Sequence, residues 1–187
     1  MATTKNDKTI SILGFRNVRI DDVDSFLKRV KVGIYPATVQ IVDATRVAGK
    51  SHLFFAFLNA KKSFEEKRAL SENLTMETLL YASGSRQISR AIEMLGVKAN
   101  TSKIAAIVFA SSEEEVKKAE DMLMKIIPGV KDDSVLDIKG RAKVDGLKKT
   151  FGVTDLELET MTHSGTVVKE ALTWLIVERV SLLSVKK

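Results

Sequence analysis

Apolar runs alternate along the chain with segments in which apolar residues recur every three or four positions. The runs over residues 9–15 and 38–42 predict strands, and the almost wholly apolar run over 103–110 is typical of a central strand buried on both faces. Helical spacing also predicts several helices. Those with both ends predicted cover residues 21–30, 75–83, 85–95, 113–127, 141–150 and 166–185. Two more are predicted from their starts: a helix of about four turns from residue 51 and a short helix from residue 154. The alternation predicts an α/β fold: a single domain with a small mixed β-sheet and several packed helices.

Capping signals locate several helix starts. Ser112 with Glu115 and Thr154 with Glu157 have the spacing of capping boxes. Thr75 is predicted as a third N-cap, with Leu74 and Leu79 placed as a hydrophobic staple and Glu77 in the first turn. The helix from residue 51 has so wide an apolar face that we expect it to be buried on more than one side.

The chain is organised around residues 79–95, LLYASGSRQISRAIEML. One helix is predicted to stop at Ser83-Gly84 and a second to start at Ser85, with the core face formed by Ile88, Ala91, Ile92 and Leu95. Arg86 and Arg90 then share the outer face, where like charges repel and the helix dipole disfavours Arg86. A bound phosphate or carboxylate would account for this pair. The alternative is that both arginines are solvated or paired with acidic neighbours such as Glu93.

Composition adds limits rather than a function. A chain of 187 residues with 44% hydrophobic residues can bury one core, so we expect one domain over 1–187, with residues 1–7 disordered. The net charge of +6 and the pI near 9.4 suit either nucleic-acid binding or solubility. Basic residues gather over 46–68, 86–103 and 139–149, and acidic residues near the C-terminus. No signal peptide or uninterrupted apolar span is visible, so we expect a cytoplasmic protein with no membrane association.

Catalytic chemistry is not indicated. The chain has no cysteine and two histidines, and it shows no metal-ligand spacing, so neither a metal nor a cofactor is expected. Gly49-Lys50-Ser51 resembles the end of a phosphate-binding loop, but Ala44 occupies the position of its first glycine. We therefore expect no catalytic residue and no small-molecule substrate, although sequence does not rule out a triad formed in space.

Two stretches resemble a known family. HLFFAFLNAKKSF (52–64) and LTMETLLYASGSRQISRAIEMLGV (74–97) are similar to the small KEOPS subunit that binds the complex's atypical kinase, the PRPK-binding protein (TPRKB) family. The likeness is weak before Thr38 and loose after Asp132. It implies a non-catalytic accessory subunit in the threonylcarbamoyladenosine modification of tRNA. Such a subunit binds the kinase-like ATPase subunit and, in archaeal-type members, the single-stranded CCA end of tRNA.

The resemblance also implies site residues. The RNA-binding candidates that match its motif are Ser83, Gly84, Arg86, Gln87 and Ile88. Helical geometry adds Arg90, and the other matching stretch supplies the weaker candidates His52, Lys61 and Lys62. Two rival functions stay open: a regulator of the kinase-like subunit that does not bind RNA, and an enzyme acting on a small anionic ligand at the arginine corner.

The C-terminal helix is the predicted site of the protein partner. Its core face is assigned to Val168, Leu172, Leu175, Leu182 and Leu183, and Glu170 and Glu178 edge a second stripe. Because relatives dock on the kinase's small lobe with this region, the partner-binding candidates are Trp174, Val177, Glu178 and Ser181. The alternative is that the second stripe packs against the preceding acidic helix.

Overall fold

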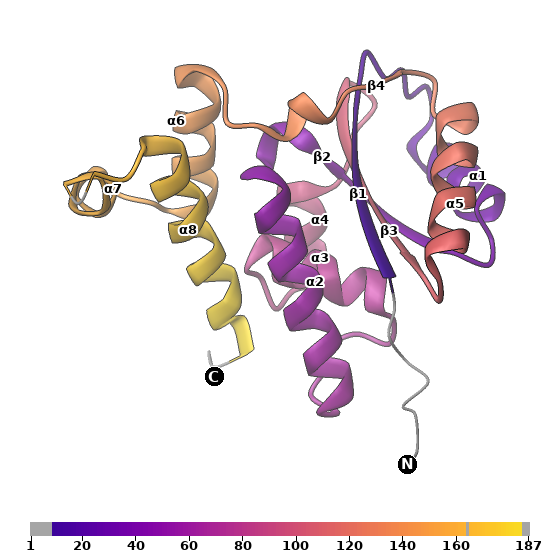
Figure 1. Ribbon diagram of the computed structural model, residues 1–187, viewed down its shortest axis with the longest axis horizontal. Helices are drawn as coiled ribbons and strands as arrows, with labels where there is room; N and C mark the ends of the chain where they lie inside the picture. Colours follow the sequence, from indigo (N-terminus) through magenta and orange to yellow (C-terminus); the bar gives the residue numbers. More distant parts are fainter. Residues whose placement is uncertain (1–8, 164, 185–187) are drawn as a thin grey trace. The chain divides into compact units, whose positions relative to one another are not determined.

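A computed structural model describes residues 9–163 and 165–184 and divides into two compact units (Figure 1). The first unit contains the chain up to Val42 and Val97–Val135, and the second contains Asp43–Gly96 and the chain from Leu136 on. Each unit is assembled from two segments that are distant in the sequence. The prediction of a single domain over 1–187 therefore stays a prediction, and residues 1–7 and Val185 lie outside the described part of the chain.

The first unit contains a small sheet. Its described strands are β1 (Thr9–Arg16), β2 (Thr38–Asp43), β3 (Lys103–Ala110) and β4 (Val130–Lys131), in the order β2-β3-β1-β4. β1 is antiparallel to β3 along its whole length, from Thr9 opposite Ala110 to Arg16 opposite Lys103, and β4 is antiparallel to the end of β1. β3 lies inside the sheet and is buried on both faces, as predicted.

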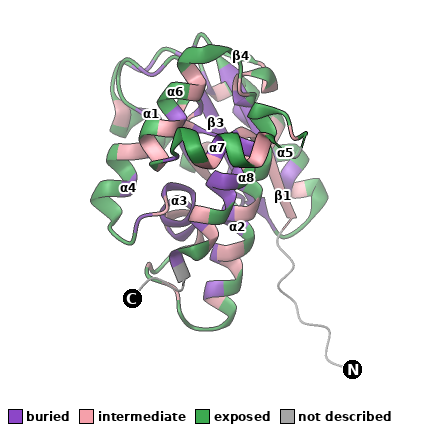
Figure 2. Ribbon diagram, turned by 90° about the vertical axis from the view of Figure 1, so that its left-hand side faces the viewer, coloured by how far each residue is buried: buried purple, intermediate pink, exposed green. Residues whose placement is uncertain are grey.

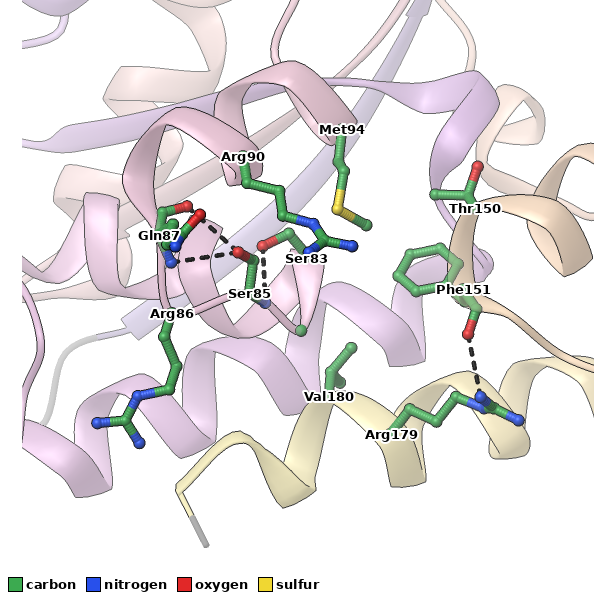
Figure 3. Close-up of a pocket in the computed structure, with 11 residues that line it drawn as sticks. Ser83, Ser85, Arg86, Gln87, Arg90, Met94, Thr150, Phe151, Arg179 and Val180 are labelled. Atoms are coloured by element: carbon green, nitrogen blue, oxygen red, sulfur yellow. Dashed lines mark hydrogen bonds between the residues drawn. The ribbon is translucent and has the colours of Figure 1, made fainter. Parts of the chain in front are cut away.

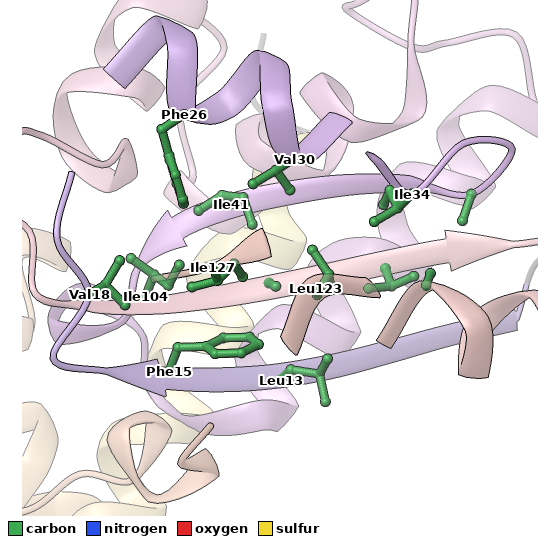
Figure 4. Packing of buried hydrophobic residues seen from close by; sticks show 14 of the residues in the cluster. Leu13, Phe15, Val18, Phe26, Val30, Ile34, Ile41, Ile104, Leu123 and Ile127 are labelled. Carbon is green, nitrogen blue, oxygen red and sulfur yellow. The ribbon is translucent and has the colours of Figure 1, made fainter. Parts of the chain in front are cut away.

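The α/β class with packed helices is confirmed, but the sheet is antiparallel instead of mixed. β3 inserts between β1 and β2 and runs opposite to both, as Figure 4 shows for the strands that carry Ile41, Ile104 and Phe15. Two-residue β4 has no apolar run of its own, and for that reason the sequence did not predict it.

Two helices, α1 (Val23–Gly33) and α5 (Glu113–Ile126), cover one face of this sheet (Figure 4). The Asp22 and Ser112 side chains cap their first turns by accepting the amide N–H of Ser25 and Glu115. The core between helices and sheet includes Phe15, Phe26, Val30, Ile104 and Leu123. The unit is thus a two-layer arrangement that follows the predicted periodicity.

The second unit is helical in the residues that the structure describes. Its helices are α2 (Gly49–Glu65), α3 (Leu74–Ser83), α4 (Ile88–Leu95), α6 (Gly140–Phe151), α7 (Asp155–Thr162) and α8 (Val168–Ser181). Three 3₁₀ turns accompany them: η1 (Ala44–Arg46), η2 (Asp133–Leu136), at which the chain leaves the first unit, and η3 (Leu182–Ser184). α7 begins with the predicted capping box of Thr154 and Glu157. Figure 2 shows α3 buried over most of its length, while α7 is largely exposed.

The start of α3 differs from the prediction. Asn73, not Thr75, is the N-cap: its Oδ1 accepts the Met76 amide at 2.8 Å, and the Thr75 hydroxyl donates to the same oxygen at 2.7 Å. Asparagine competes well for this position because its carbonyl reaches the free amides of the first turn. Glu77 is buried, and one of its carboxylate oxygens accepts the Leu70 and Ser71 amides at 3.0 and 2.9 Å. Its role is to fix the preceding loop.

Two predicted apolar faces are also corrected. α2 packs against both α3 and α8, as its wide apolar face predicts, but Phe54 and Leu58 of that face are exposed. In α8, Val168 is exposed, as is Leu182 just beyond it, although both were assigned to the core, while Leu172, Leu175 and Leu183 are buried as predicted. The reason is that α8 contacts α2, α6 and α7 on different sides, so no single stripe describes its packing.

Candidate functional site

A tight corner joins α3 to α4. α3 ends at Ser83, and Gly84 follows in the left-handed conformation with φ of 64°. The Ser85 amide then donates to the Leu80 carbonyl at 3.2 Å, which satisfies a carbonyl at the end of the helix. Glycine is favoured at Gly84 because a side chain would strain this backbone.

Two serine hydroxyls shape the corner from within. The Ser83 hydroxyl donates to the Leu80 carbonyl at 2.9 Å and accepts the Ser85 amide at 3.2 Å. The Ser85 hydroxyl accepts the Gln87 amide at 3.2 Å. Gln87 is the N-cap of α4, but its side chain makes no capping bond. Both hydroxyls are therefore used by the turn, and the Gln87 side chain is not.

The structure moves the start of α4 and revises its apolar face. α4 begins at Ile88, so Arg86 precedes the helix and does not form an i,i+4 pair with Arg90 inside it. Ala91 and Leu95 are buried as predicted, whereas Ile88 and Ile92 are exposed. An eight-residue helix packs through a narrow stripe, which Ala91 and Leu95 fill.

A pocket of about 410 Å³ opens beside this corner (Figure 3). Its first wall comes from the corner and α4, and its second wall from the end of α6 and from α8. The lining residues are Ser83, Gly84, Ser85, Arg86, Gln87, Arg90, Met94, Thr150, Phe151, Arg179 and Val180. Local sequence patterns indicate most of the first wall but not the second, because more than fifty residues separate the two walls.

The three arginines of the pocket differ in their surroundings. Arg90 is exposed and makes no hydrogen bond or ion pair with the residues described here. Arg86 is exposed, and in Figure 3 its side chain extends away from that of Arg90. Arg179 donates from Nη1 to the Phe151 carbonyl at 3.1 Å and pairs through Nη2 with the Glu157 carboxylate. The pocket thus combines an unpaired cation with a paired one.

Glu157 is held as a carboxylate. Its Oε2 accepts the Thr154 amide and the Thr154 hydroxyl, each at 2.7 Å. These hydrogen bonds, the amide bond first, and then the nearby Arg179 charge lower the pKa of Glu157 from its usual value. Arg179 therefore faces a charged partner at neutral pH.

His52 lies behind the pocket and does not line it. The ring is fully buried: Nδ1 accepts the Ala48 amide at 3.2 Å, and Nε2 lies 2.8 Å from the Ala82 carbonyl. Because Nδ1 accepts, Nε2 carries the proton and donates it to Ala82. The ring also stands edge-on to Phe151, with centroids 5.3 Å apart. Burial lowers the pKa of His52 to about 4, so the ring is neutral and supports the corner. We no longer count it among residues that could touch a ligand.

The two lysine candidates lie on α2 and are not among the lining residues. Lys61 is 3.9 Å from the Glu65 carboxylate and is half-buried, while Lys62 is exposed. The structure therefore gathers Ser83, Gly84, Arg86, Gln87 and Arg90 in one pocket and leaves both lysines outside its lining. Ile88, at the start of α4, is exposed and also lies outside the lining.

The partner-binding candidates do not share one exposed stripe. Trp174 is 48% exposed and Glu178 is exposed, but Val177 is only 6% exposed. The Ser181 hydroxyl accepts the Asn59 side-chain amide at 3.1 Å. Trp174 instead packs against α2. The centroid of its ring lies 5.7 Å from that of the Phe55 ring, and the ring centroids of Phe55 and Phe54 are 5.8 Å apart. We call Phe54, Phe55, Leu58 and Trp174 the aromatic face.

Two further features of the described residues bear on function. These residues contain no group of three or more histidine, cysteine, aspartate or glutamate side chains arranged to hold a metal ion. Nor is any helix within 9–163 and 165–184 both long and apolar enough to span a bilayer.

Two comparisons with known proteins bear on this site. The family model described as kinase binding protein CGI-121 matches residues 15–184. The regulatory protein Cgi121 of Methanocaldococcus jannaschii is 30% identical over 148 residues, which cover 79% of this chain and 84% of that protein. The family match spans both walls of the pocket and the aromatic face.

Proposed function

This chain belongs to the CGI-121 family of kinase-binding proteins, and on that premise we propose that it is a non-catalytic accessory subunit of the KEOPS complex. The family resemblance drawn from residues 52–64 and 74–97 is confirmed by this membership. In the proposal, the chain binds the kinase-like ATPase subunit and the single-stranded CCA end of tRNA in the cytoplasm. The threonylcarbamoyl transfer itself belongs to another subunit, and no cofactor or metal is assigned to this chain.

The observation that carries the RNA-binding part is the unpaired Arg90 beside a turn of small residues. Arg90 has no competing carboxylate among the described residues, so its charge is available to a phosphate. Ser83 and Gly84 present little side-chain bulk, which allows a strand to approach the backbone. The volume of about 410 Å³ lies within the range of pockets that hold small ligands, and suits one nucleotide.

The aromatic face is the surface that we assign to the kinase-like partner. Its members come from α2 and α8, and Phe54, Leu58 and Trp174 are all partly exposed. Large aromatic anchors with an exposed rim are typical of protein interfaces. This assignment keeps Trp174 from the sequence prediction, with the exposed Glu178 one turn further along α8, and replaces the buried Val177 with residues of α2.

Trimming the CCA end from tRNA should weaken its binding to the purified chain by at least tenfold. In the proposal the affinity comes from a pocket of about one nucleotide's volume that receives the single-stranded end, so removing that end removes the main contact. Filter binding at one fixed salt concentration, with intact and trimmed tRNA side by side, measures the difference. Equal affinities would contradict recognition of the CCA end.

Arg86→Ala and Arg90→Ala should each weaken tRNA binding and flatten its salt dependence. When a phosphate contact is lost, fewer counterions are released on binding. The slope of log affinity against log salt concentration then becomes shallower by about 0.7 per contact for single-stranded RNA. Arg141→Ala is a matched control, because this arginine lies on α6 outside the pocket lining and its side chain is 94% exposed. A lowered melting temperature with an unchanged salt slope would assign Arg86 or Arg90 to structure.

A second candidate function is regulation of the kinase-like subunit without RNA binding. The name of the Methanocaldococcus relative, a regulatory protein, favours it. Co-purification with the kinase-like subunit, together with no binding of either intact or trimmed tRNA, would support this candidate over the first. Turnover of a small anionic ligand by the isolated chain would instead support an enzyme.

A further inference from the structure

The pocket contains cations of two electrostatic kinds. Arg90 has no partner charge among the described residues, so a ligand phosphate meets a full positive charge there. Arg179 already faces the Glu157 carboxylate, so its net attraction for a second anion is much reduced. The two arginines therefore suit different parts of one ligand.

Arg179 is also held in a fixed orientation. One bond goes to the Phe151 carbonyl and one to Glu157, which is itself fixed by Thr154. A guanidinium has five N–H donors, so three remain without an acceptor among the described residues. The Arg179 side chain is 31% exposed, and the residue lines the pocket. Donors that are pre-oriented and partly neutralised favour hydrogen bonds to uncharged oxygen and nitrogen acceptors.

Apolar side chains lie on both walls of the pocket. Phe151 stands near Arg179 on the second wall, and Met94 lies beside Arg90 on the first (Figure 3). The Phe151 ring is steadied from behind by the edge-on His52 ring. The Phe151 ring takes the flat face of a nucleobase better than a phosphate, because an aromatic ring offers stacking area and no charge.

We propose that Arg179 hydrogen-bonds the base edge or ribose of the 3′-terminal nucleoside of a single-stranded RNA, while Arg90 meets its phosphate charge. Phe151 and Met94 hold the base. This inference rests on the proposed RNA-binding function and deepens it by dividing the pocket into a nucleoside subsite and a phosphate subsite. Arg179 thus determines preference for the terminal nucleoside, and Arg90 supplies salt-dependent affinity.

The first test compares labelled ACCA and ACC oligoribonucleotides over a series of salt concentrations. The double variant Arg179→Gln/Glu157→Gln removes both charges of the ion pair, so it should weaken ACCA binding by about tenfold, bring it close to the affinity for ACC, and leave the salt slope unchanged. Arg90→Gln should lower the slope and keep the preference for ACCA. Arg141→Gln removes the same charge outside the pocket lining and should change neither quantity. A slope reduced equally by the double variant and by Arg90→Gln would overturn the assignment.

The second test does not depend on the fold of the double variant. Glu157→Gln removes the charge that compensates Arg179, while the Thr154 end of the cap keeps a hydrogen-bond partner. The uncompensated guanidinium then attracts phosphate. The affinity for ACCA should therefore be higher at low salt and should fall more steeply as the salt concentration rises. An unchanged or shallower slope would overturn the proposal, even if the double variant fails to fold.

Adenosine monophosphate alone completes the design. It should bind the wild-type protein at least tenfold more weakly than ACCA does. Equal affinity would identify a free nucleotide as the ligand and would overturn the proposal that the pocket binds an RNA end. If wild-type protein discriminates intact from trimmed tRNA but the double variant keeps the preference for ACCA over ACC, only this inference fails. If the wild-type protein binds no RNA at all, the proposed function fails with it.

Discussion

Acidification from about pH 7 to pH 4 should lower the free energy of unfolding of the wild-type protein by about 3 kcal/mol more than that of a His52→Gln variant. The cause is the buried imidazole. Its Nδ1 lone pair accepts the Ala48 amide, so a second proton would break that bond and place an uncompensated charge among buried groups. The nearby Lys143 charge disfavours the imidazolium further.

The direction follows from proton binding in the two states. Burial lowers the pKa of His52 from the ordinary 6.5 to about 4 in the folded chain. Between these values the unfolded chain binds a proton that the folded chain does not, so stability falls as the pH falls. The contribution is flat above about pH 6.5 and is largely lost by about pH 4. Urea unfolding at a series of pH values measures it.

The other histidine provides the control. His163 is exposed at the end of α7, and the chain contains no third histidine. The His163→Gln variant should show the same decrease in the free energy of unfolding on acidification as the wild-type protein, whereas the His52→Gln variant should lack it. Glutamine can still donate to the Ala82 carbonyl, which favours a folded variant. Parallel pH profiles for wild type and His52→Gln would contradict the assignment.

Local signals predicted the parts of this fold that local physics decides. The Thr154 and Glu157 capping box is present as predicted, because both partners lie within one turn. The apolar run of β3 predicted a strand buried on both faces, and β3 lies inside the sheet. In both places the residues that decide the structure lie within one short stretch of the sequence.

Prediction failed where distant segments decide exposure. Ile92 has the same helical spacing as Leu95, yet it is exposed, because a helix of eight residues packs through one stripe only. Val177 was assigned to an exposed stripe and is buried, because α8 has neighbours on several sides. Spacing fixes which residues share a face but not how many faces the rest of the chain will cover.

The candidate pocket was half predictable for the same reason. Ser83, Gly84 and Arg86 belong to one recognisable corner, so a motif revealed them together. Phe151 and Arg179 come from α6 and α8, and only the folded chain brings them to that corner. Arg179 had no distinguishing signal, since its partner Glu157 lies 22 residues away.

Replacing Trp174 by alanine should weaken binding of the kinase-like subunit by more than tenfold. Trp174 is 48% exposed, and its ring packs on Phe55, so its indole joins the two helices of the aromatic face. Truncating a tryptophan anchor at an interface costs about 2 kcal/mol or more, and tenfold corresponds to about 1.4 kcal/mol. Calorimetric titration with the kinase-like subunit measures the loss.

Leu156→Ala is the matched control for this substitution. Leu156 is an exposed apolar residue on α7 and does not belong to the aromatic face, so its truncation should leave partner affinity unchanged. Trp174→Ala should still bind tRNA as the wild type does, because Trp174 does not line the pocket. A thermal melt establishes that the variant is folded. Full partner affinity in a folded Trp174→Ala protein would remove the aromatic face as the docking surface, and unfolding would show that the tryptophan serves the core of the second unit instead.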